Sequence, residues 1–338
     1  MTGQVTATAL GDWPGTDPLE ATKAIRGELG TPHLPVLAEL PERGVGSDPI
    51  GRTASLLLGL HADVQPHGWR LVPHPGRDAA RAESALSTDL NVLADVVGGE
   101  EHSAEELQVR ILGPLSLMAG AYLPSGERVL ADHGARRDVA QSLADGVVPF
   151  LDRVARAVPG TRLTVQLDEP EAARVLGGLL PTASGYRTLR SVPGGEARSA
   201  WGRVTESLRA AGAETVVVNL PAWEAPIGRV LAAGADGVSL PLADLTVPQW
   251  EGLAGAVEAG ARLWLGALPH DAGPRPGTGE LAERVVRPWR QLGLPVDALD
   301  AVRLAPAGSL ATLTPVAATA CLARTVKLAD AVNQIALG

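Results

Sequence analysis

Cysteine is almost absent from this chain of 338 residues, which contains only Cys321. A secreted module stapled by disulfides is therefore excluded. Aromatic residues are also scarce, at 3% of the chain, and seven of the ten are tryptophan. The core must then be built mainly from Ala, Val and Leu, and each tryptophan becomes a candidate gap filler or flat ligand surface.

Long apolar runs are missing as well. The longest ones, such as residues 216–220 and 302–306, are far shorter than the ~20 residues that span a bilayer. The chain also opens without the basic, apolar and small-residue pattern of a signal leader. We therefore expect a cytoplasmic protein that has no membrane partner.

Positive charge is in deficit, because 29 Lys and Arg face 38 Asp and Glu, giving a net charge of -9. An acidic chain repels a phosphate backbone, and no basic cluster interleaved with aromatics offsets that repulsion locally. We therefore expect no nucleic-acid partner.

The chain does contain a repeated alternation of short β-branched runs and longer helical patterns, which is typical of βα units and a parallel sheet. A first strand is predicted at residues 5–10. Further strands are predicted at 107–112, 162–167, 215–219, 237–240, 262–266 and 302–304, with helices between them. Residues 30–75 are rich in Pro and Gly and form an irregular excursion with a short helix at 50–60 and a hairpin at 68–72.

Eight βα units closing into a barrel would cover every apolar strand on both faces. We therefore predict an α/β fold, a single (β/α)8 TIM barrel over residues 1–338. Seven strands are clear, and the eighth could lie at 34–40, 69–72 or 186–189. An open, doubly wound sheet is the alternative, but its phosphate-binding signatures, GxGxxG after the first strand and GxxxxGK[ST], do not occur.

In such a barrel, function belongs to the carboxyl ends of the strands. Asp168 and Glu169 follow the strand at 162–167 directly, so we predict both as catalytic carboxylates, which could titrate as a coupled pair. The competing interpretation is that one caps the next helix and the other is solvated. His270 also follows a strand and is a candidate acid, base or ligand.

Other reactive groups carry weaker signals. Cys321 lies in a predicted helix among small apolar residues, as an inert core cysteine does. Ser309 follows a strand but lacks a GxSxG elbow. No HxxH or HxC spacing occurs in the sequence, so no metal site is expected.

Three segments carry a family resemblance: Gly-Asp-Trp-Pro-Gly-Thr at 11–16, the strand and Gly-Pro pair at 107–114, and Gln-Leu-Asp-Glu-Pro at 166–170. They resemble the catalytic C-terminal barrel of cobalamin-independent methionine synthase, and more closely its short single-barrel relatives. The same superfamily includes uroporphyrinogen decarboxylase. The resemblance covers nearly the whole chain and implies the same barrel fold.

In that family, a zinc ion held by His, Glu and two Cys binds the homocysteine thiol, and methyl-tetrahydrofolate supplies the methyl group. Zinc lowers the thiol pKa so that the thiolate nucleophile exists near neutral pH. The resemblance places the four ligand positions at Asn219, Pro221, about Pro241, and Gly308. None of these residues supplies the required donor, so we expect neither zinc nor the zinc-thiolate route.

A second departure lies in the opening turn, where Asp12 replaces the Ser that helps the family hold the amino acid's carboxylate. The mouth that remains suits a flat ligand with positive charge or several N–H donors. A reduced folate such as methyl-tetrahydrofolate fits as a co-substrate. The substrate-binding candidates are Asp12, Trp13, Asn219, Trp223 and Ser309.

Three hypotheses follow. The first is a diverged methyltransferase that works without zinc on an acceptor other than homocysteine. The second is a non-catalytic barrel that binds a folate or another small metabolite, as a homo-oligomer or beside a catalytic paralogue. The third is a decarboxylase like the porphyrinogen enzymes, which would require an arginine cluster at the mouth from Arg43, Arg52 and Arg110.

Overall fold

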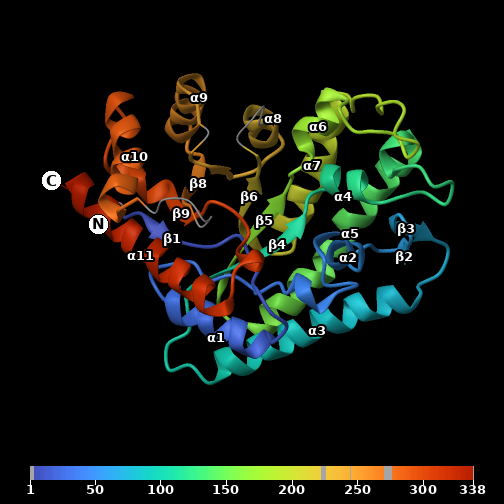
Figure 1. The fold of residues 1–338 in the computed structure, drawn as a ribbon, viewed down its shortest axis with the longest axis horizontal. Helices are drawn as coiled ribbons and strands as arrows, with labels where there is room; N and C mark the ends of the chain where they lie inside the picture. The colour runs from blue at the N-terminus through green and yellow to red at the C-terminus, as the bar shows by residue number, and fades with distance from the viewer. Residues whose placement is uncertain (1–3, 222–225, 244, 270–275, 338) are drawn as a thin grey trace.

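The computed structural model describes residues 4–221, 226–243, 245–269 and 276–337. Seven strands form one parallel sheet that curls inside a layer of helices (Figure 1). In spatial order they are β1 (Thr6–Ala7), β9 (Val302–Pro306), β8 (Arg262–Leu268), β7 (Gly237–Pro241), β6 (Ala213–Asn219), β5 (Arg162–Asp168) and β4 (Glu106–Leu112). The six strands predicted downstream of residue 100 are all present.

Residues 34–39 take the eighth place, between β1 and β4. The N–H of Leu37 donates to the Gln108 carbonyl at 2.8 Å, and the N–H of Gln108 donates to the Pro35 carbonyl at 2.9 Å. On the other side, the N–H of Leu34 donates to the Ala7 carbonyl at 2.9 Å. Pro35 has no N–H to donate, so the pairing consists of separate bridges rather than a ladder. These bonds close the predicted (β/α)8 barrel and select 34–40 among the three candidate strands.

The other two candidates have different partners. Strand β3 (Gly68–Val72) pairs antiparallel with β2 (His61–Gln65) in a hairpin outside the barrel. Residues 186–189 contribute only an isolated antiparallel bridge between Pro181 and Thr188. The expected helix at 50–60 is shorter than predicted, because α2 (Pro49–Ala54) begins at the Asp48 cap and ends before the apolar residues 56–58.

Helices follow most strands and cover the outside of the barrel (Figure 1). Besides α2, the helices in chain order are α1 (Pro18–Glu28), α3 (Arg77–Gly98), α4 (Pro114–Gly120), α5 (His133–Ala157), α6 (Ala172–Gly177), α7 (Gly194–Ala210), α8 (Ile227–Ala232), α9 (Val247–Glu258), α10 (Thr278–Gln291) and α11 (Pro315–Leu337). Of these, α4 and α6 are short. Within the described ranges, no helix combines the length and apolar character needed to cross a membrane.

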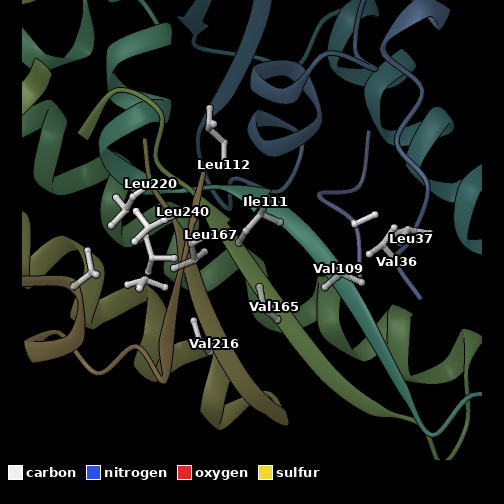
Figure 2. Packing of buried hydrophobic residues seen from close by; sticks show 14 of the residues in the cluster. Val36, Leu37, Val109, Ile111, Leu112, Val165, Leu167, Val216, Leu220 and Leu240 are labelled. Carbon is white, nitrogen blue, oxygen red and sulfur yellow. The ribbon is translucent and has the colours of Figure 1, made fainter. Parts of the chain in front are cut away.

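The two faces of the strands differ in polarity. Val109 and Ile111 of β4 pair with Val165 and Leu167 of β5 in the layer between sheet and helices (Figure 2). Since side chains alternate along a strand, the residues between them point into the barrel. Most inward residues of β4 and β5 are polar, among them Gln108, Arg110, Thr164, Gln166 and Asp168, whereas the inward Leu112 is apolar.

Buried and paired side chains fill the barrel interior at the amino-terminal ends of the strands. Arg303 donates to Glu106 at 2.6 Å, and its guanidinium lies over the Trp264 ring at 5.5 Å from the centroid. Trp264 is buried against Leu34 and Val217. A ligand must therefore enter from the opposite end, where the strands have their carboxyl termini, which we call the mouth.

Candidate functional site

A buried arginine joins the acidic residues at the mouth. The Arg110 guanidinium donates to Asp12 through Nη1. Its Nε and Nη2 both donate to Glu39 Oε2, at 3.0 and 2.6 Å respectively. Its Nη1 also lies 3.3 Å from Asp168 Oδ2. These four residues, which we call the Arg110 cluster, come from four neighbouring strands or strand ends. Asp12 and Asp168 were predicted at the mouth, Arg110 was named only for the decarboxylase hypothesis, and Glu39 was not predicted.

A chain of amides fixes the orientation of Asp168. Gln166 Nε2 and Asn219 Nδ2 donate to Asp168 Oδ1 at 2.7 and 3.1 Å. Gln108 Nε2 in turn donates to Gln166 Oε1 at 3.0 Å. The Leu10 carbonyl accepts from Gln166 Nε2 at 3.2 Å, which fixes the direction of that amide because a carbonyl can only accept. Oδ1 is thus held as an acceptor, and Oδ2 is the atom that faces Arg110.

The pKa values of the two mouth aspartates, Asp12 and Asp168, shift in opposite directions. Burial raises the pKa of Asp168 to about 6, with the charge of Asp12 adding to this and Arg110 and the two amides opposing it. Burial also disfavours ionised Asp12, but the charge of Arg110 and hydrogen bonds that include one from Ser309 outweigh it, so the pKa of Asp12 is lowered. Near neutral pH, Asp12 is a fixed anion and Asp168 can exchange a proton.

Glu169 lies apart from this cluster, although it adjoins Asp168 in sequence. It is fully buried, and its carboxylate accepts from the Leu115 and Ser116 N–H groups at 3.0 and 2.8 Å. It also accepts from the Ser116 hydroxyl and the Trp201 indole, both at 2.7 Å. Burial raises its pKa to about 7, against the effect of these donors. Glu169 therefore joins the end of β5 to α4 and α7, and does not contact the Arg110 cluster.

Of the remaining predicted site residues, the structure describes Trp13 and Ser309. Trp13 is buried in the core, and its backbone N–H donates to the Glu39 backbone carbonyl at 2.8 Å. Ser309 hydrogen-bonds Asp12, and its hydroxyl accepts from the Ala311 N–H at 3.2 Å. Trp223 and His270 lie outside the described residues.

A pocket opens at the mouth over β6 to β9. It has a volume of about 200 Å³, and its lining includes Asn219, Ser239 and Pro306. A larger cleft of about 620 Å³ extends from it between α9 and α10, with Gly266 and Ala307 lining both. Together they have the size of an ordinary small-molecule site.

Three of the four positions matched to zinc ligands, Asn219, Pro221 and Pro241, line the smaller pocket. They offer one amide and two prolyl rings, and the fourth, Gly308, has no side chain. Within the described parts of the chain, no group of three or more His, Cys, Asp or Glu residues is placed to hold a metal ion.

The three arginines named for the decarboxylase hypothesis do come together, but each has an acidic partner. Arg52 lies 3.3 Å from Glu39 and also pairs with Asp89, which takes Arg43 as well at 2.8 Å. Arg110 shares Glu39 with Arg52. Because every guanidinium is already paired with a carboxylate, this cluster gives no support to binding a substrate with many carboxylates.

The stability of the fold should depend on pH because the pKa values of two buried carboxyl groups are raised. With pKa values raised to about 6 for Asp168 and about 7 for Glu169, the folded state binds more protons than the unfolded state between about pH 5 and pH 7. The free energy of unfolding should therefore fall as the pH rises through that range, by on the order of 1 kcal/mol per pH unit for each group. Urea unfolding at several pH values checks this, and a curve that rises over the range would contradict it.

Comparisons with known proteins give structural likeness only. No protein-family model matches the sequence, and no curated protein matches it. A B12-independent methionine synthase from Shewanella sp. W3-18-1, solved in complex with selenomethionine, has a TM-score of 0.65 at 10% identity, covering 99% of each chain. A methyltransferase from Methanosarcina mazei has a TM-score of 0.59 at 9% identity, covering 98% of this chain and 94% of its own. At these identities the likeness shows that this chain has the barrel fold of those two proteins.

Proposed function

We propose that the chain is a diverged barrel of the methionine synthase and methyltransferase kind, whose mouth binds a flat, N–H-rich small molecule. A reduced folate such as methyl-tetrahydrofolate is the proposed methyl donor. The observation that carries the proposal is Asp168, which hydrogen-bonds Asn219 of the mouth pocket and whose pKa is raised by burial to about 6. The likeness in fold to a methionine synthase and a methyltransferase supports the reaction class.

Each polar residue of the mouth has a distinct role in this proposal. Two amide donors occupy Oδ1 of Asp168, so Oδ2 is the oxygen left for the ligand. Oδ2 accepts a hydrogen bond from a ligand N–H when Asp168 is ionised, and it carries the exchangeable proton when Asp168 is neutral. Arg110 keeps Asp168 in place and stays cationic throughout. Glu169 acts as a positioning residue that fixes the end of β5 to α4 and α7.

Zinc does not fit the part of the mouth that the structure describes. An amide, two prolines and a glycine at the matched positions lack the thiolate, imidazole and carboxylate donors that zinc binds. Two carboxylates of the mouth, Asp12 and Asp168, already face the cation of Arg110. We therefore propose that the methyl group is transferred from the folate to an acceptor whose nucleophile forms without a metal ion. Homocysteine is not this acceptor.

Calorimetric titration of methyl-tetrahydrofolate into the purified protein tests the proposal. Wild type should bind it saturably, and Asp168→Asn should weaken binding by tenfold or more, because an amide cannot accept in the same way as a carboxylate at Oδ2. Asp138→Asn is the matched control, since Asp138 is exposed on α5 and pairs only with its neighbour Arg137. Absence of saturable binding, or equal loss in both variants, would overturn the proposal. Binding without transfer to any acceptor would identify a non-catalytic barrel.

A further inference from the structure

The Asp12 carboxylate is surrounded by the kinds of donor groups that bind a free carboxylate. Its carboxylate receives Arg110 Nη1, a hydrogen bond from Ser309 and one from its own backbone. Gly11 precedes it with φ +118°, a backbone conformation that brings the chain close over the Arg110 side chain. A cation, a hydroxyl and an N–H group that converge on two oxygens are the usual donors for a free carboxylate.

The Arg110 guanidinium has two places for carboxylates, and they differ in access. Glu39 takes Nε and Nη2 and is almost fully enclosed, with 4% of its side chain exposed. Asp12 takes Nη1, and 12% of its side chain is exposed. Asp168, the other acid near Nη1, is similarly exposed at 14%, but it lies 3.3 Å away and is held by Gln166 and Asn219. Asp12 therefore fills the closer of the two partly exposed carboxylate places on Nη1.

We infer that Asp12 is a specificity-determining residue, a built-in carboxylate that excludes ligand carboxylates from Arg110. The exclusion is both steric and electrostatic, because a ligand carboxylate would have to displace Asp12 and would then meet its charge. The mouth is left to recognise ligands through their N–H groups. This consequence for ligand choice rests on the proposed function, whereas the carboxylate place itself does not depend on it.

Shortening Asp12 should turn the place into an anion site. In Asp12→Ala, Arg110 Nη1 and the Ser309 hydroxyl lose their shared acceptor, and a space of carboxylate size remains. Formate is the smallest free carboxylate that can fill it. In Asp12→Asn, the side chain keeps its volume and fills the place without charge, so this variant is the matched control.

The experiment measures the melting temperature of the full chain against increasing sodium formate, with sodium chloride at equal ionic strength as the reference. Asp12→Ala should melt below wild type and be rescued saturably by formate beyond the chloride effect. Wild type and Asp12→Asn should follow chloride alone. Carbon-13 formate NMR should show at least tenfold tighter binding to Asp12→Ala than to wild type.

Two results would overturn the inference: a formate response of Asp12→Ala that equals its chloride response, or a wild type that responds as strongly as the variant. If Asp12→Ala fails to fold without the anion, refolding it in formate against chloride gives the same comparison. Asp12→Ser leaves most of the space open and should bind formate as well. Because no folate is present, failure of the folate titration and failure of this test are separate outcomes.

Discussion

Arg110→Met is expected to destabilise the protein by roughly 3–5 kcal/mol. The substitution keeps much of the side-chain volume but removes the one cation that Asp12, Glu39 and Asp168 share. Arg52 would still face Glu39, whereas Asp12 and Asp168 would face each other uncompensated. Urea unfolding near pH 7 measures the loss.

Arg110→Lys separates the effect of charge from that of geometry. Lysine keeps a cation but cannot bind Glu39 through two nitrogens while it also reaches Asp12, so an intermediate loss is expected. The pKa of Asp168 should rise further above about 6 in Arg110→Met, because the nearby positive charge that lowers it is gone. A loss below about 1 kcal/mol in Arg110→Met, the range of an exposed ion pair, would contradict the account of the cluster.

Glu169→Ala is expected to have an effect of similar size, on the order of 3–5 kcal/mol. The indole of Trp201, two backbone N–H groups and the Ser116 hydroxyl would lose their acceptor in a buried place. Water is excluded there, since Glu169 and Trp201 are at most 1% exposed. The anchoring of α4 and α7 to the end of β5 would weaken with it.

Glu171→Ala is the matched control for this prediction. Glu171 is two residues further along and makes a partly exposed pair with Arg174 at 2.8 Å, so its loss should change stability by less than about 1 kcal/mol. Tryptophan fluorescence adds a local readout, because the Trp201 indole donates directly to Glu169. An equal loss in both variants would mean that the four hydrogen bonds to Glu169 contribute little.

The barrel could be predicted because each βα unit has a local signature in the sequence. The runs at β4 to β8 are short, rich in β-branched and other apolar residues, and followed by helical patterns, so their positions could be predicted from the sequence. The eighth strand could not be selected in this way. Residues 34–39 carry Pro35, which disfavours a regular strand, and their pairing depends on partners at Ala7 and Gln108 that only the closed barrel supplies.

The site was predictable in place but less so in composition. Strand ends locate Asp12 and Asp168, but the side to which Glu169 points is set by α4 and Trp201, which are remote in sequence. Arg110 had a usable signal, because Gln108 and Arg110 alternate with apolar residues in β4 and so share the inward face. Its partners lie 71 and 98 residues away, and no local pattern links them.

The described part of the mouth is thus organised around a fixed arginine and an aspartate that can exchange a proton. Arg110 supplies the permanent positive charge, and the amide chain from Gln108 through Gln166 gives Asp168 one fixed acceptor oxygen. Such a mouth can orient a polar ring and move a proton near neutral pH. Within the described part of the chain, no group of metal ligands is placed to lower the pKa of a bound thiol.

The most direct test of this claim is the zinc content of the protein, purified without a histidine tag and without chelator and measured by mass spectrometry of the metal. Our account predicts far less than one zinc per chain, with no gain after incubation with zinc and dialysis. About one zinc per chain that survives dialysis and is lost in Asp168→Asn would contradict it, because Asp168 would then be a metal ligand rather than a proton-exchanging group.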